Sequence, residues 1–121
     1  MNQEVMKKRT KEFAKRIINL CKSLPDTREG RLIGNQLFRS GTSVGANYRA
    51  ACRARSKAEF IAKMDIVLEE ADESLYWLEI LDETKIMKKD LLSQLMEEAD
   101  ELISIFVKTL LTSKSNNKPQ D

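Results

Sequence analysis

Apolar side chains recur along the chain at the three- and four-residue spacing that places them on one face of a helix. This pattern predicts helices over about residues 3–24, 27–55, 57–82 and 87–112, with no segment showing the two-residue period of a strand. Each helix carries one apolar line, which we expect to face a shared core. The lines consist of Met6, Phe13, Ile17, Leu20, Cys21 and Leu24; Ile33, Leu37, Val44, Tyr48 and Ala51; Phe60, Met64, Val67, Ala71, Leu75 and Leu78; and Leu91, Leu95, Leu102, Ile103, Phe106 and Leu110.

Local stop and start signals separate these helices. Pro25 and Asp26 end the first helix, because the residue before a proline is disfavoured in helical conformation. Asp26 or Thr27 can cap the second helix with a side-chain oxygen. Ser56 and Glu59 have the spacing of a capping box and mark the start of the third helix.

The short connections between the helices favour antiparallel neighbours. At 121 residues the chain is long enough for one core, and no internal repeat divides it. The sequence therefore predicts an all-α, antiparallel up-down-up-down four-helix bundle, a single domain over residues 1–112. Residues 113–121 are polar, and we expect them to form a disordered tail.

The second helix carries arginines on the side opposite its apolar line, in a sector roughly 80° wide. These are Arg28, Arg31, Arg39, Arg49 and Arg53. A planar guanidinium suits carboxylate and phosphate alike, so three interpretations stay open: a solvated face, a contact with acidic residues of a neighbouring subunit, and a nucleic-acid-binding surface. The nearby aromatics are Phe38 and Tyr48, and Tyr48 lies toward the core. This favours recognition of RNA backbone or shape over base reading.

Three glycines, Gly34, Gly41 and Gly45, lie together on a flank of the same helix. Each glycine inside a helix costs about 0.5–1 kcal/mol relative to alanine. Their grouping therefore predicts close helix packing, with a neighbouring backbone near this flank. On the first helix, Lys8, Lys11, Lys15 and Lys22 gather on the side away from the core.

The third helix has a second apolar group outside its core line. Ile66, Tyr76, Trp77 and Ile80 lie about 100–160° around the helix from that line. Single exposed apolar residues are ordinary. Four on one side, including the only tryptophan, are better explained by an interface between subunits of a homo-oligomer.

The net charge of +2 conceals a strong asymmetry along the chain. Residues 1–63 contain 15 Lys or Arg and five Asp or Glu, whereas residues 64–121 contain six and 14. Such a division indicates an electrostatic partner, either nucleic acid or acidic helices packed beside basic ones.

Composition removes several classes of function. The chain has no histidine, the commonest general base and metal ligand, and no catalytic, zinc or phosphate-loop motif. We expect no enzyme activity, no cofactor or metal, and no small-molecule substrate. No apolar run is long enough to cross a bilayer, so we expect no membrane partner and a cytoplasmic location. Cys21 and Cys52 are expected to stay reduced.

Between Gln36 and Leu81 the chain also contains sequence motifs long enough to be specific. The pattern QL-x-RS-x-x-SV-x-AN-Y-R, followed by RARSKAEF and DESLYWLEIL, resembles the bacterial four-helix-bundle family named for reading frames inside intervening sequences of 23S rRNA genes. The resemblance covers roughly residues 5–112. Where that family is expected to have an acid after Tyr-Arg, this chain has Ala50. The resemblance implies a bundle that assembles into a homo-oligomeric ring, typically a pentamer, and implies no proven activity.

These observations lead to two hypotheses. The first is a non-enzymatic homo-oligomeric protein that binds structured RNA, or another nucleic acid, through its basic faces. The second is a protein-interaction scaffold or adaptor whose basic faces contact acidic protein surfaces. Ring assembly would repeat a weak basic patch several times, so modest contacts to RNA could sum through multivalency.

Overall fold

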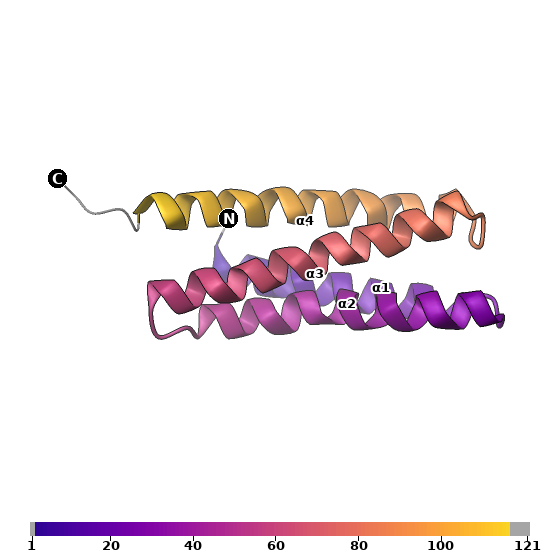
Figure 1. The fold of residues 1–121 in the computed structure, drawn as a ribbon, viewed down its shortest axis with the longest axis horizontal. Coiled ribbons are helices and arrows are strands. Elements are labelled where there is room, and N and C mark those ends of the chain that lie inside the picture. The colour runs from indigo at the N-terminus through magenta and orange to yellow at the C-terminus, as the bar shows by residue number, and fades with distance from the viewer. Residues whose placement is uncertain (1, 117–121) are drawn as a thin grey trace.

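The structure, a computed structural model, describes residues 2–116. Within them the chain forms four long helices and no strand: α1 (Gln3–Lys22), α2 (Arg28–Cys52), α3 (Lys57–Glu83) and α4 (Lys89–Asn116). All four run along the long axis of the molecule, with the α1–α2 and α3–α4 turns at one end and the α2–α3 turn at the other (Figure 1). The predicted all-α class is confirmed.

Side-chain caps set three of the helix starts. The side-chain oxygens of Asn2, Thr27 and Ser56 accept hydrogen bonds from backbone N–H groups in the first turns of α1, α2 and α3. The Ser56 oxygen lies 3.1 Å from the Glu59 nitrogen, and a Glu59 carboxylate oxygen accepts the N–H of Arg55 at 3.1 Å. The capping pattern in the sequence therefore does locate the start of α3.

The far end of α4 differs from the sequence prediction. The helix continues through Ser113 to Asn116, residues we expected to lie in a disordered tail. The stretch contains neither proline nor glycine, and extending an existing helix costs far less than nucleating one. Residues 117–121, the rest of that predicted tail, lie outside the described residues.

The four apolar lines meet in one core. Phe13, Ile17, Leu37, Met64 and Phe106 are among its fully buried side chains. The second helix contributes as predicted, through Leu37, Val44, Tyr48 and Ala51. Several of the other expected core residues are only partly buried and pack against its edge: Cys21, Leu24, Ile33, Phe60, Leu75 and Ile103.

One predicted core position is wrong. Leu91 is 57% exposed, and Leu92 is buried in its place. The buried line of α4 passes through Leu92, Leu95, Ala99 and Leu102 in steps of three and four residues. Leu91 is turned about 100° away from Leu92, because each residue advances the helix by that angle.

Buried polar side chains in the core are hydrogen-bonded. The Ser74 hydroxyl lies 2.8 Å from the Glu70 carbonyl oxygen and 3.1 Å from the Ser40 hydroxyl of α2. The Thr10 hydroxyl donates to the Met6 carbonyl at 2.8 Å. Pairing of this kind removes the penalty for burying a hydroxyl group, which costs about 1–3 kcal/mol when left unsatisfied.

Each helix packs mainly on its neighbour in sequence, and α1 and α4 touch far less than the other adjacent pairs. An ion pair supplements the α1–α4 contact: Arg9 Nη2 lies 2.7 Å from carboxylate oxygens of both Glu98 and Glu101. The hydrogen bond from Arg9 lowers the pKa of Glu98 below its usual range. In the part of the chain that the structure describes, no helix has an apolar stretch suited to spanning a membrane.

Candidate nucleic-acid interface

The arginines of α2 do not form one continuous site. Arg39 points to α3, where its Nη1 lies 3.0 Å from a Glu70 carboxylate oxygen and its Nη2 hydrogen-bonds Glu73. Arg31 lies 2.7 Å from Asp26 in the preceding turn. Arg28 is exposed in the first turn of α2, about 30 Å along the helix from Arg49. The structure thus separates these three arginines from the other two.

Arg49 and Arg53 meet lysines of α1. The two arginines and Lys8 and Lys11 line a hollow of about 450 Å³ between the C-terminal part of α2 and the N-terminal part of α1. We call these four residues the basic groove. Glu4, Val5 and Lys7 complete its lining, and Lys7 pairs with Glu4 at 3.2 Å.

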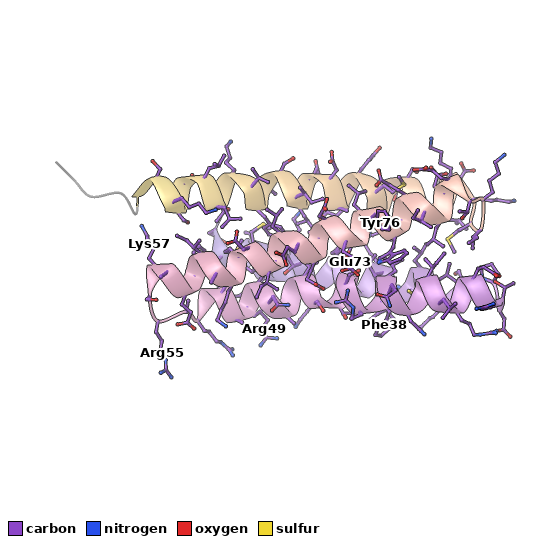
Figure 2. The ribbon with its side chains drawn as sticks, in the orientation of Figure 1. Phe38, Arg49, Arg55, Lys57, Glu73 and Tyr76 are labelled. Atoms are coloured by element: carbon purple, nitrogen blue, oxygen red, sulfur yellow. The ribbon has the colours of Figure 1, made fainter. Side chains whose placement is uncertain are left out.

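None of the four cations of the basic groove forms an ion pair with an acid among residues 2–116. Arg49 and Arg53 are exposed, and Arg49 lies on the outer edge of α2 (Figure 2). At the adjoining α2–α3 turn, Arg55 and Lys57 extend the positive charge to the end of the molecule (Figure 2). A cleft lined mainly by positive charge concentrates counter-ions, and Glu4, the one acid in the lining, is paired with Lys7. This surface therefore suits an anionic ligand.

The periodicity of the sequence predicts that Lys8 and Lys11 share one side of the first helix, but it does not predict that they lie near Arg49 and Arg53. Helical periodicity gives directions around one helix only. The glycine flank was the available signal for the groove, because it identifies the side of α2 on which a neighbouring helix packs closely.

The glycines lie where α2 meets α1. A Cβ atom on Gly41 would lie 2.8 Å from two side-chain carbons of Ile17, and one on Gly45 would lie 3.3 Å from the Thr10 backbone. At Gly34 it would lie 2.9 Å from a Leu24 methyl group. All three glycines are buried. Their small size lets α1 approach closely and brings the two rows of cations to one groove.

The four apolar residues singled out on α3 differ in exposure. Ile66 and Tyr76 are 43% and 52% exposed, whereas Trp77 and Ile80 are half-buried. The rings of Tyr76 and Trp77 meet edge to face with centroids 5.0 Å apart. Tyr76 lies on the outside of α3, one turn from Glu73 (Figure 2).

Trp77 and Arg39 share an acceptor. The indole nitrogen of Trp77 lies 3.1 Å from a Glu73 carboxylate oxygen. Partial burial acts to raise the pKa of Glu73, but the hydrogen bonds from Arg39 and Trp77 outweigh it and lower the pKa. Trp77 is therefore held partly by its own chain, which leaves Tyr76 and Ile66 as the more available apolar contacts.

The aromatics near the arginines have different environments. Tyr48 is buried and stacks on Phe106 with ring centroids 6.1 Å apart. Burial raises the pKa of its phenol, and the interaction with the neighbouring Cys52 raises it further. Phe38 is 46% exposed on the outer edge of α2 (Figure 2). Of these two rings, only Phe38 can reach a ligand.

The described residues contain no group of His, Cys, Asp and Glu that could hold a metal ion. Cys21 and Cys52 are free thiols, and burial raises the pKa of Cys21. A raised thiol pKa keeps the sulfur protonated and poorly nucleophilic at neutral pH.

Four amphipathic helices around one apolar core, with an unpaired basic groove on one side, define an all-α helical-bundle protein. The chain belongs to the family described as 23S rRNA-intervening sequence protein, which matches residues 2–108. The resemblance seen in the sequence is thereby confirmed.

The fold is also similar to a crystal structure from Bacteroides thetaiotaomicron VPI-5482, described as a protein with unknown function from the S23 ribosomal protein family. The two chains share 37% identity and a TM-score of 0.84, over 91% of this chain and 98% of the other. A search of curated proteins found no match.

Proposed function

We propose that this protein is a non-enzymatic, cytoplasmic RNA-binding protein that works as a homo-oligomer of antiparallel up-down-up-down bundles, a pentameric ring. One observation carries the RNA part. Lys8, Lys11, Arg49 and Arg53 come from two helices and converge on one hollow without an acidic partner among residues 2–116. Like charges that lie close together repel one another, and an anionic ligand that supplies counter-charge relieves this repulsion.

The spacing of these cations fits a repeated anion. Lys8 and Lys11 are three residues apart on α1, and Arg49 and Arg53 are four apart on α2. On a helix these separations place both members of each pair on the same side, about 4.5–6 Å apart along the axis. Two such rows can contact successive phosphates of one strand. Phosphate contacts supply affinity without sequence selectivity.

A second candidate is the protein-interaction scaffold, and a second hollow favours it. Between α1 and α4, Glu97, Glu98, Asp100 and Glu101 line a space of about 390 Å³ together with Arg16 and Gln94. The basic groove of one copy could meet this acidic surface on another protein molecule. In that case the groove would serve assembly rather than RNA.

A salt series with structured RNA separates the two candidates. Arg49→Gln/Arg53→Gln removes two charges from the groove. As a matched control, Lys88→Gln/Lys89→Gln removes two exposed charges from the junction between the α3–α4 turn and α4. If the groove binds phosphates, the first variant should flatten the slope of log affinity against log salt by about 1.4–1.8 units. The control variant should leave the slope unchanged.

Two results contradict the RNA proposal. One is an equal change in slope for both variants, which would mean that only net charge matters. The other is negligible affinity of the wild type for RNA at physiological salt, together with looser assembly of the groove variant in light scattering. That second result would support the scaffold.

A further inference from the structure

A smaller hollow opens on the same side of α2, near the α1–α2 turn. Its volume is about 260 Å³, and Phe38 forms one wall. Gly30 and Gly34 contribute backbone without side chains, and Asn35 and Arg31 contribute polar groups. The hollow thus combines an aromatic surface with hydrogen-bonding side chains.

The hollow and the basic groove are aligned along α2. Phe38 and Arg49 are eleven residues apart, so they differ by only about 20° around the helix and are separated by about 16 Å along it. Both lie on the same edge of α2 (Figure 2). A ligand of a few nucleotides can therefore reach both.

The charge of the hollow differs from that of the groove. Its one cation, Arg31, is already paired with Asp26 at 2.7 Å. Burial raises the pKa of Cys21, another lining residue, and so favours its neutral thiol. The hollow therefore offers no net positive charge to a phosphate. A flat, uncharged group with polar edges fits it better.

We propose that this hollow takes an unpaired base of the bound RNA, stacked on Phe38, while neighbouring phosphates occupy the basic groove. The inference rests on the proposed function. Aromatic side chains stack on bases only where the bases are unpaired and can leave the helix. The preferred ligand is then RNA in which a bulge or single-stranded segment adjoins a paired region, rather than a perfect duplex. Asn35 can exchange hydrogen bonds with the edge of the base, since an amide both donates and accepts.

The test compares two hairpins of equal length and charge, one fully paired in its stem and one with a single-nucleotide bulge. Phe38→Ala should weaken binding of the bulged hairpin about fivefold or more, because loss of one stacked base typically has at least that effect. Binding of the paired hairpin and both salt slopes should stay the same. Leu32→Ala, which alters another exposed apolar residue of α2, should change neither affinity.

A fluorescence experiment reads the contact directly. In Phe38→Trp/Trp77→Phe the only indole lies at the hollow, and stacking on a base should quench its emission. The bulged hairpin should quench it, and the paired hairpin should not. Equal quenching by both hairpins, or none by either while both bind, overturns the inference.

The outcomes also distinguish failure of the proposed base site from failure of the proposed RNA-binding function. If wild-type protein binds both hairpins equally and Phe38→Ala matches it, the base site is wrong while the RNA function stands. If wild type binds neither hairpin at physiological salt, the RNA function fails first. If Phe38→Ala instead produces smaller oligomers, Phe38 belongs to a subunit contact and the base site is overturned.

Discussion

Individual charged side chains in this molecule have contrasting roles. Arg39 is half-exposed, yet two carboxylates of α3 already surround its guanidinium. Arg49, on the same helix, faces the lysines of α1 and has no acidic partner within residues 2–116. Residue type and exposure alone would make these two arginines equivalent. The neighbouring helix decides that one links two helices and that the other can take a ligand.

The properties of Glu98 are likewise determined by a residue of a neighbouring helix. Its side chain is 14% exposed and accepts hydrogen bonds from Arg9 at 2.8 and 2.7 Å. These bonds lower the pKa of Glu98 more than burial raises it. A carboxylate whose pKa is depressed by folding stabilises the fold above its unfolded pKa of about 4.3 and loses that contribution as pH falls through the folded value.

Glu98→Gln should therefore destabilise the protein in a pH-dependent way. At pH 7 we expect a loss of about 1–2 kcal/mol in the free energy of unfolding, typical of a partly buried pair with charge-assisted hydrogen bonds. As the pH falls through the lowered folded-state pKa of Glu98, the difference from wild type should shrink, because Glu98 becomes protonated. Urea unfolding at several pH values measures it. Glu97→Gln, on the exposed side of α4, is the control, and a pH-independent loss for Glu98→Gln would contradict the assignment.

Among the elements, α2 depends most on its small residues. Gly41 packs on Ile17, which is fully buried and cannot move aside, whereas Gly45 faces the Thr10 backbone at a slightly larger distance. A methyl group at either position would gain helix propensity of about 1 kcal/mol. The contacts with α1 oppose that gain, and more strongly at Gly41.

Gly41→Ala should consequently destabilise the fold by about 1–2 kcal/mol, since overpacking a core typically costs 1–3 kcal/mol. Gly45→Ala should cost less. Thermal and denaturant unfolding of the two single variants measures both effects. Combining Gly41→Ala with Ile17→Ala removes the opposing side chain, so the double variant should be more stable than the sum of its parts. An increase in stability for Gly41→Ala alone would mean that α1 does not press on this position.

At the scale of the whole molecule, the bundle keeps an apolar surface outside its core. Ile66 and Tyr76 are exposed on α3, and the ring of Tyr76 contacts that of the partly buried Trp77. Apolar groups clustered on an outer face are typical of an interface between subunits. The internal hydrogen bond of Trp77 makes that residue a poor place to test assembly, because its replacement also disturbs Glu73.

Tyr76→Glu should disrupt assembly while leaving the bundle folded. A charge at a buried interface costs far more than the same charge in water. Light scattering should show smaller species than wild type, with unchanged helical content by circular dichroism. Leu111→Glu, at an exposed site on α4, is the matched control and should keep the wild-type size. A wild-type protein that is monomeric at micromolar concentration would refute the interface.

The features that could be predicted from the sequence are those set by residues close together in the chain, and the features that could not are set by packing between helices. The start of α3 follows from Ser56 and Glu59 themselves, so the sequence locates it correctly. The prediction that Leu91 is buried was wrong because a shift of one residue along a helix changes the direction of a side chain by about 100°. Near the start of α4, few other residues define the direction of the buried apolar line. The sequence predicts that the arginines of α2 point to one side of the helix. Which of them contact Asp26, which contact α3 and which lie beside α1 depends on how the helices pack.

The sparse contact between α1 and α4 has a consequence for how the chain folds. Each of the other adjacent pairs joins helices that follow one another in sequence, so most contacts close only short loops. Proteins dominated by such contacts reach the native state in microseconds to milliseconds. The pair of Arg9 with Glu98 joins the two ends of the chain and requires the largest loop closure, whose entropic cost grows with loop length. We therefore expect the contacts between consecutive helices to form first during folding and the α1–α4 contact to form last.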